Sequence, residues 1–303
     1  GVVLPGEMIA LISYFTQVLL AMTVTANLVL AVPRTLSAME RLEEVLSQEE
    51  DLELLDKPIY SENKACILEL KNLSYVYDTE ARPVLNKIDL EIYPGSFIGI
   101  IGSTGSGKSS LARIMQRLYD PQEGIVFLQG RDIRSYSRQV ISKTIGYVPQ
   151  KIELLQGTIR SNLTLGLEEK VSDEKLWQAL EIAQGQEFVM QLEDGLDHKV
   201  ERSGRNFSGG QRQRLTIARA ILRSPEILIM DDSMSALDYK TERQLMENLQ
   251  KYYRNKTLIF ISQRIHTLQQ AKRILVLEEG CLVGEGTHEE LLANNPIYQE
   301  IQA

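Results

Sequence analysis

Cysteine is scarce in this sequence. Cys66 and Cys281 are the only two among 303 residues, and each stands alone in a strand-like segment. Neither has the partner spacing of a metal site, and two isolated thiols do not make the disulfide framework of a secreted domain. The pair therefore predicts reduced, structural thiols in a domain that faces the cytosol.

Positive charge is also limited. The chain has 33 Lys and Arg against 41 Asp and Glu, a formal net charge of −8, and no long basic run. Proteins that bind phosphate backbones without sequence preference need a concentrated positive surface. The composition therefore argues against nucleic acid as a partner.

Charge is absent altogether from one long segment near the N-terminus. Residues 8–32, MIALISYFTQVLLAMTVTANLVLAV, contain no Asp, Glu, Lys or Arg. As a helix rising ~1.5 Å per residue they would extend roughly 37 Å, more than the ~30 Å hydrocarbon core of a bilayer. A signal peptide would begin with basic residues, but Glu7 precedes this segment and no Lys or Arg occurs before Arg34. A buried soluble helix is rarely uncharged for so long, so we expect a helix that spans a lipid bilayer.

The residues that flank this span predict its orientation. Arg34 and Arg41 follow it and nothing basic precedes it. Because basic residues are enriched on the cytoplasmic side of membrane helices, the C-terminal side should face the cytoplasm, where ATP is available. We therefore expect the span in the cell membrane, plasma or inner, with the rest of the chain in the cytoplasm.

Polar residues within the span gather along one side of the predicted helix. They are Ser13, Thr16, Gln17, Thr23 and Asn27. Such a face either packs and hydrogen-bonds against other membrane helices or lines a substrate pathway, and both alternatives need neighbouring helices. The sequence also begins at Gly1 rather than Met, so we expect the C-terminal part of a longer polypeptide that supplies the remaining transmembrane helices.

The composition and the residue pattern of the sequence change twice after the span. Residues 1–48 are expected to form the last transmembrane helix and its cytoplasmic extension. Residues 49–64, a segment that is rich in acidic residues and includes Pro58, are expected to form a linker. From residue 65 to 303, short β-rich segments such as FIGIIG, ILIMD and TLIFIS alternate with helical stretches. This alternation predicts an α/β domain with a largely parallel core sheet.

The first chemical motif is GSTGSGKSS at residues 102–110. It fits G-x-x-x-x-G-K-[ST] and lies between an apolar strand and a helical segment, which is the context of a phosphate-binding loop. Lys108 is expected to reach the β- and γ-phosphates of ATP, and the Ser109 hydroxyl to coordinate Mg²⁺. The predicted ATP-binding residues of the loop are Gly102, Ser103, Thr104, Gly105, Ser106, Gly107, Lys108, Ser109 and Ser110.

Three further motifs carry a family resemblance. They are, along the chain, YVPQ, which ends at Gln150, NFSGGQRQRLTIARAIL at residues 206–222, and ILIMDDSMSALD at residues 227–238. In this order, after a phosphate loop, the chain resembles the ATP-binding cassette (ABC) superfamily, whose signature LSGGQ occurs here as FSGGQ. The resemblance implies a P-loop NTPase fold with a RecA-like core, an antiparallel β-subdomain and a helical signature subdomain at about residues 153–218. A membrane helix that leads directly into the nucleotide-binding domain is typical of exporter half-transporters.

The resemblance also assigns site residues by position. Tyr77 would stack on adenine, Asp231 would hold Mg²⁺ through its water shell, and Gln150 would reach the metal and the attacking water. The signature would bind the γ-phosphate of the ATP held by a partner domain, in trans, and the D-loop would end at Asp238. The signature residues are Ser208, Gly209, Gly210 and Gln211.

Two positions depart from the pattern of the hydrolytic family members. Asp232 occupies the position of a catalytic Glu, and its carboxylate is drawn back by more than ~1 Å, a displacement that can cost ~100-fold in rate. Gln263 follows Ser262 where a switch His is usual, and an amide cannot carry a proton or a positive charge near neutral pH. His266 lies three residues on, but the match of ISQR to the family's ISHR makes it an ordinary helical residue. We therefore expect this site to bind ATP and to hydrolyse it weakly.

These departures predict the degenerate-site half of a heterodimeric exporter. Two identical copies would leave both composite sites impaired, whereas a different half-transporter could supply an intact Glu and His. A slow homodimeric exporter and a regulatory ATP-binding subunit without transport remain as alternatives. A soluble ATPase acting on DNA or ribosomes would lack the apolar span and would show a basic surface.

Overall fold

The computed structural model describes residues 4–47, 52, 54–55, 57–77, 82–167 and 169–302. It divides into two compact units, Gly1–Glu53 and Leu54–Ala303. The expected linker at 49–64 lies partly outside the described residues, so its predicted extent remains a prediction.

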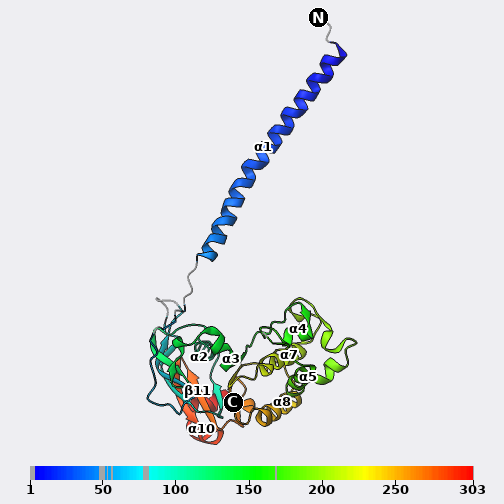
Figure 1. Cartoon of the computed structure of the whole chain (residues 1–303). Coiled ribbons are helices and arrows are strands. Elements are labelled where there is room, and N and C mark those ends of the chain that lie inside the picture. The colour runs from blue at the N-terminus through cyan, green and yellow to red at the C-terminus, as the bar shows by residue number, and fades with distance from the viewer. Residues whose placement is uncertain are drawn as a thin grey trace. The chain divides into compact units, whose positions relative to one another are not determined.

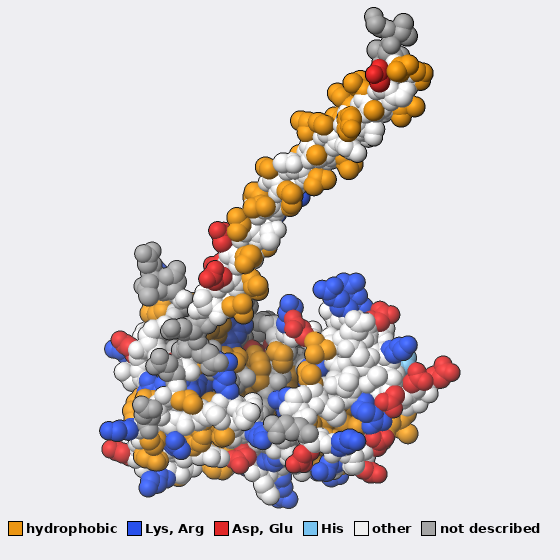
Figure 2. Space-filling model, turned by 45° about the horizontal axis from the view of Figure 1, so that its top comes forward, with side chains coloured by type: hydrophobic (Ala, Val, Ile, Leu, Met, Phe, Trp, Pro, Cys, Tyr) orange, Lys and Arg blue, Asp and Glu red, His pale blue; other side chains and the backbone are white. Residues whose placement is uncertain are grey.

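The first unit is one helix, α1 (Pro5–Leu46), of 42 residues. Pro5 suits the first turn because the backbone N–H that it lacks would have no partner there. An 18-residue window of α1 has a mean hydropathy of 1.8, none of its residues is buried within the described chain, and Figure 2 shows hydrophobic side chains along most of it. The Thr16 and Thr23 hydroxyls donate to the carbonyl oxygens of Ile12 and Leu19 at 2.8 Å. These two polar groups of the predicted polar face are therefore satisfied within the helix itself.

The second unit is built around a six-stranded sheet in the order β12-β11-β3-β10-β9-β6. Five strands run parallel and only the edge strand β12 is antiparallel. The strands are β3 (Phe97–Ile101), β6 (Ile145–Val148), β9 (Ile227–Asp231), β10 (Thr257–Ile261), β11 (Arg273–Glu278) and β12 (Cys281–Gly286). The inner strands β9 and β10 are buried at every residue, which explains why their sequences are continuous apolar runs.

A second sheet of four antiparallel strands has the order β2-β1-β4-β5. Its strands are β1 (Leu68–Tyr75), β2 (Leu85–Ile92), β4 (Glu123–Leu128) and β5 (Arg131–Asp132). Side chains from both sheets share one buried core with helix α2 (Lys108–Met115), which contributes Leu111 and Ile114. This packing fixes the start of α2, and with it the phosphate-loop motif, against the larger sheet.

The helices form the rest of the unit (Figure 1). They are α3 (Arg138–Thr144), α4 (Ile159–Leu163), α5 (Asp173–Ile182), α6 (Gln186–Met190), α7 (Gly209–Leu222), α8 (Tyr239–Tyr252), α9 (Ile265–Leu268), α10 (His288–Asn294) and α11 (Pro296–Gln302), with a two-stranded sheet of β7 (Gly157–Thr158) and β8 (Lys199–Val200). The helices α4, α5 and α7 lie side by side in the part of the chain expected to form a helical subdomain.

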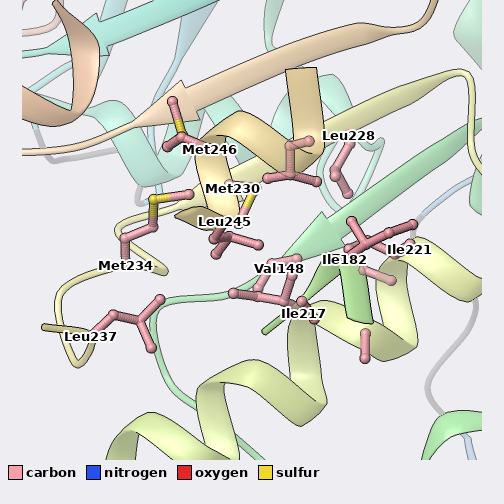
Figure 3. Close-up of a cluster of buried hydrophobic side chains, with 14 of the residues drawn as sticks. Val148, Ile182, Ile217, Ile221, Leu228, Met230, Met234, Leu237, Leu245 and Met246 are labelled. Carbon is pink, nitrogen blue, oxygen red and sulfur yellow. The ribbon is translucent and has the colours of Figure 1, made fainter. Parts of the chain in front are cut away.

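A second buried cluster joins these helices to the sheet (Figure 3). Val148 of β6 and Met230 of β9 lie with Ile217 of α7 and Leu245 of α8 among its members. The fold is thus the expected α/β P-loop architecture with an antiparallel second sheet and a helical region. Cys281, expected in a strand-like segment, begins β12, but the extent of this half-exposed strand, CLVGEG, was not predicted because it lacks a long apolar run.

Candidate functional site

The loop between β3 and α2 has a backbone that requires its glycines. Gly105 and Gly107 have φ angles of 86° and 101°, in the left-handed region that side chains with a Cβ rarely adopt. A Cβ on Gly102 would lie 1.9 Å from the carbonyl oxygen of Leu277. Gly107 directly precedes α2, so the first N–H groups of that helix face the loop's interior. The loop can therefore wrap closely around an anion.

Lys108 directs its charge into this loop. Its Nζ donates hydrogen bonds to the carbonyl oxygens of Gly102 at 2.8 Å and Ser103 at 2.6 Å, and to Ser106 Oγ at 3.3 Å. Burial lowers the pKa of Lys108, and the nearby carboxylates, first that of Asp231, oppose this effect. A buried ammonium group that bonds only neutral oxygens is placed to receive a phosphate.

A cavity of about 300 Å³ opens beside the loop. Among the expected site residues it is lined by Thr104, Gly105, Gly107, Lys108, Ser109, Ser110, Gln150, Asp231, Asp232 and Gln263. Gly102, Ser103 and Ser106 are not among its lining residues. The Ser103 hydroxyl instead lies 2.8 and 2.9 Å from the carboxylate oxygens of Glu278, a partner that the sequence analysis missed.

Oxygen atoms of two expected metal ligands meet in this cavity. The Ser109 hydroxyl donates to Asp231 Oδ1 at 3.2 Å, and Asp231, at the end of β9, is only 4% exposed. Mg²⁺ prefers oxygen ligands and often takes only one or two protein groups, with nucleotide phosphates and water completing its shell. No group of three or more His, Cys, Asp or Glu forms a metal cluster among the described residues. The residues present fit a magnesium ion that binds together with a nucleotide.

Tyr147 is a site residue that the sequence analysis missed. Its hydroxyl donates to Asp231 Oδ2 at 3.0 Å. Burial, followed by the negative charge of Asp231, raises the pKa of the Tyr147 phenol well above its ordinary value, so the group stays a neutral donor. The pairing of β6 with β9 brings the two residues together. Tyr147 is the first residue of the YVPQ motif, so the sequence held a signal by which it could have been found.

Asp232 has an unusual backbone and a bound carboxylate. Its φ angle is 43°, and its N–H donates to the carbonyl oxygen of Ile261 at 2.8 Å. Asp and Asn tolerate this left-handed conformation better than most residues. Gln150 Nε2 donates to Asp232 Oδ2 at 3.0 Å. Burial raises the pKa of Asp232, and the Gln150 hydrogen bond lowers it to a smaller extent.

The structure places Gln263, and not His266, at the cavity. His266 lies on α9, where its Nε2 is 3.3 Å from Glu242 Oε2 of α8. Glu242 is buried and also accepts a hydrogen bond from Thr267 at 2.6 Å. The imidazole therefore belongs to the contact between α8 and α9, which agrees with its assignment as an ordinary helical residue.

Tyr77 is half-exposed and lies near the start of α2. Its hydroxyl is 2.9 Å from Ser110 Oγ and accepts a hydrogen bond from Arg113 at 3.2 Å. Its ring meets Tyr75 and Tyr119 edge-on, at centroid distances of 4.9 and 5.6 Å. Tyr77 is not among the residues that line the cavity, so its contact with adenine stays a prediction.

The signature residues lie at the N-terminus of α7. Ser208 is the N-cap: its Oγ accepts from the Gln211 N–H at 3.2 Å, and Gln211 Oε1 accepts from the Ser208 N–H at 2.8 Å. A Cβ on Gly209 would meet no atom closer than 3.9 Å, so the helix start is accessible. None of the four signature residues lines this chain's own cavity. Asp238 caps α8 through a 3.0 Å hydrogen bond from the Thr241 N–H.

Comparison of the sequence with known proteins finds relatives that bind ATP, in agreement with the nucleotide site described above. Residues 85–235 match the family model described as ABC transporter. An uncharacterised ABC transporter ATP-binding protein of Mycobacterium bovis is 40% identical over 301 residues, 98% of this chain and 51% of the relative. A multidrug resistance ABC transporter ATP-binding and permease protein of Lactococcus lactis is 33% identical over 298 residues, 98% of this chain and 50% of the relative.

One solved structure gives the same result for the fold. The structure of a bacterial Atm1-family ABC exporter with ATP bound matches with a TM-score of 0.81 and 29% sequence identity, over 89% of this chain and 47% of that chain. The chain thus spans about half the length of the curated relatives and of the solved structure that it matches.

Proposed function

Since this chain belongs to the ABC transporter family and has the fold of its exporters, we propose that it is the degenerate-site half of a heterodimeric ABC exporter. It binds ATP and Mg²⁺ at its own phosphate loop and hydrolyses that ATP slowly. Helix α1 lies in the cell membrane with further transmembrane helices, and the nucleotide-binding unit lies in the cytoplasm. ATP binding and hydrolysis in the assembled complex drive export of a substrate.

One observation supports the proposal: residues of the phosphate loop line the same cavity as Asp232 and Gln263, the two residues that depart from the pattern of hydrolytic family members. Lys108, Ser109 and Asp231 supply the cation and the oxygen ligands that a magnesium nucleotide needs. Asp232 and Gln263 line the same cavity at the positions of the catalytic Glu and switch His. The residues that would bind ATP are therefore unaltered, whereas the two residues that would assist the attacking water and the γ-phosphate are altered.

The chemistry of hydrolysis explains why these two changes matter. The attacking water must be oriented and deprotonated by a carboxylate, and the charge that develops on the γ-phosphate must be stabilised. The shorter Asp232 already accepts a hydrogen bond from Gln150, which occupies part of its acceptor capacity. The Gln263 amide can donate a hydrogen bond to the phosphate but brings no positive charge.

The signature supports a different chain as partner. The N-terminus of α7 can bind an anion and does not line this chain's own cavity, so it can serve the γ-phosphate of an ATP bound by the partner. A partner with its own Glu and His would then have a complete composite site. A homodimer would repeat Asp232 and Gln263 in both sites.

The experiment that tests this arrangement is purification of the full-length protein from its native membrane, followed by identification of the chains that accompany it. We expect a second, different half-transporter that carries an intact catalytic Glu and switch His. A complex of this chain alone would favour the slow homodimer. Transport of substrate into vesicles by the complex would exclude the regulatory subunit, and ATP turnover without transport would support it.

A further inference from the structure

Two residues of the segment YVPQ, residues 147–150, each donate a hydrogen bond to one of the consecutive acids Asp231 and Asp232. The Tyr147 hydroxyl bonds Asp231 Oδ2, and the Gln150 amide bonds Asp232 Oδ2, both at 3.0 Å. Tyr147 lies within β6, whereas Gln150 lies beyond the end of that strand. The two donors therefore differ in how firmly the fold holds them.

We propose that Tyr147 is a positioning residue that fixes the Asp231 carboxylate in the orientation required for magnesium nucleotide binding. This inference rests on the proposed function, because it assigns a role toward the metal that accompanies ATP. Tyr147 acts through Asp231 and itself touches neither metal nor nucleotide.

The hydrogen bonds of Asp231 explain how its orientation is fixed. Ser109 donates to Oδ1 at 3.2 Å, and Tyr147 donates to Oδ2 at 3.0 Å, so each carboxylate oxygen has its own donor. A hydroxyl that gives its proton to Oδ1 keeps its lone pairs free, which suits Ser109 as a metal ligand. Without the Tyr147 hydroxyl, only the Ser109 bond would orient the carboxylate, and Oδ2 of this nearly buried residue would lose its donor.

The position of Tyr147 makes it a rigid support. Residues 145–148 pair in parallel with β9, and Tyr147 lies opposite Ile229, two residues before Asp231. Its half-buried ring packs against the core shared by the two sheets. The Asp231 carboxylate is therefore held by a donor that belongs to the sheet itself.

The test is a Mg²⁺ titration of nucleotide binding by the full chain in detergent, with Tyr147→Phe compared to wild type. A fluorescent ATP analogue reports binding, first in EDTA and then at increasing Mg²⁺. Loss of a group that supports a metal ligand typically costs 10- to 100-fold in metal affinity. We expect Tyr147→Phe to need roughly tenfold more Mg²⁺ for half-maximal enhancement, with binding in EDTA unchanged.

Two sets of variants separate positioning from folding. Tyr253→Phe removes a buried hydroxyl that donates to the Ile221 carbonyl, and neither residue lines the cavity, so this variant should leave the Mg²⁺ requirement unchanged. Tyr147→Met also lacks the donor and should reproduce the shift. In an Asp231→Asn background, Tyr147→Phe should add nothing, because the group that it positions is already altered.

Three outcomes would overturn the inference. They are an unchanged Mg²⁺ requirement in Tyr147→Phe, an equal loss of binding with and without Mg²⁺, and a full additional shift in the Asp231→Asn background. A wild-type chain whose nucleotide binding does not respond to Mg²⁺ at all would instead contradict the proposed function. Failure of the inference about Tyr147 is thus distinguishable from failure of the proposed function.

Discussion

Single residues decide what this site can do. Lys108 is buried among carbonyl oxygens of its own loop, and its ammonium group has no carboxylate in hydrogen-bond contact among the described residues. Its three bonds are to neutral oxygens, so a phosphate that enters the loop gives it a stronger, charge-assisted partner.

The first prediction concerns this charge. Lys108→Ala should weaken ATP binding by roughly 10- to 100-fold, because a hydrogen bond to a charged group is worth about 1.5–3 kcal/mol. Titration with labelled ATP measures the change. Lys151→Ala is a matched control, since the Lys151 side chain is 89% exposed and should leave affinity unchanged. Unchanged affinity in Lys108→Ala would refute the assigned phosphate loop.

Some residues of the site could be predicted from the sequence, and others could not. The loop at 102–110 was predictable because its glycines, its lysine and its hydroxyls act within a few residues of each other. Tyr147 and Glu278 were missed because their partners, Asp231 and Ser103, are 84 and 175 residues away. Only the strand order of the sheet brings such pairs together.

At the scale of elements, α7 connects the signature to the core. Its N-terminus is capped by Ser208, and its buried face, which includes Ile217 and Ile221, packs in the cluster of Figure 3. The accessible start of the helix is thus held rigidly by its buried body.

The second prediction follows from this arrangement. Ser208→Ala should leave ATP binding by this chain nearly intact and should lower ATP turnover in the assembled complex, since the hydroxyl serves the partner's γ-phosphate. The substitution also removes a helix cap worth about 1 kcal/mol. Thr287→Ala, which removes the N-cap of α10, is therefore the control and should lower thermal stability without lowering turnover. Loss of this chain's own binding with normal turnover would reject the assignment in trans.

Elements were predictable where burial is complete. The apolar runs ILIMD and TLIFI became β9 and β10 because strands buried on both faces read as continuous hydrophobic sequence. The edge strand β12 includes two partly exposed glycines, Gly284 and Gly286, and has no long apolar run. Its extent is set by its pairing with β11, which its own sequence does not reveal. Helix α1 was predictable from its uncharged length alone.

At the scale of the whole molecule, the account depends on two sites that differ. In the proposed arrangement, this chain contributes its phosphate loop and an accessible signature, and Asp232 and Gln263 stand at the hydrolytic positions of its own cavity. The two altered side chains act on the same water and the same phosphate, so their effects should not be additive.

The third prediction is a gain of function. Asp232→Glu combined with Gln263→His should increase hydrolysis at this site by more than the two single changes together. Each single change leaves one altered group in the cavity, so each alone should help little. The singles, the double variant and wild type are compared by phosphate release in complexes with the same partner, whose own catalytic Glu is disabled. A double variant that gains no more than the sum of the two single changes would contradict the proposed cooperation.

The central claim is tested most directly by phosphate release from this chain's site in the assembled complex with the partner's catalytic Glu disabled. That background is necessary because the partner's own site would otherwise dominate the signal. The account predicts that wild-type chain binds ATP yet releases phosphate at least ~100-fold more slowly than an intact paralogue, the scale of one misplaced catalytic group. A wild-type site that hydrolyses at the paralogue's rate would contradict it.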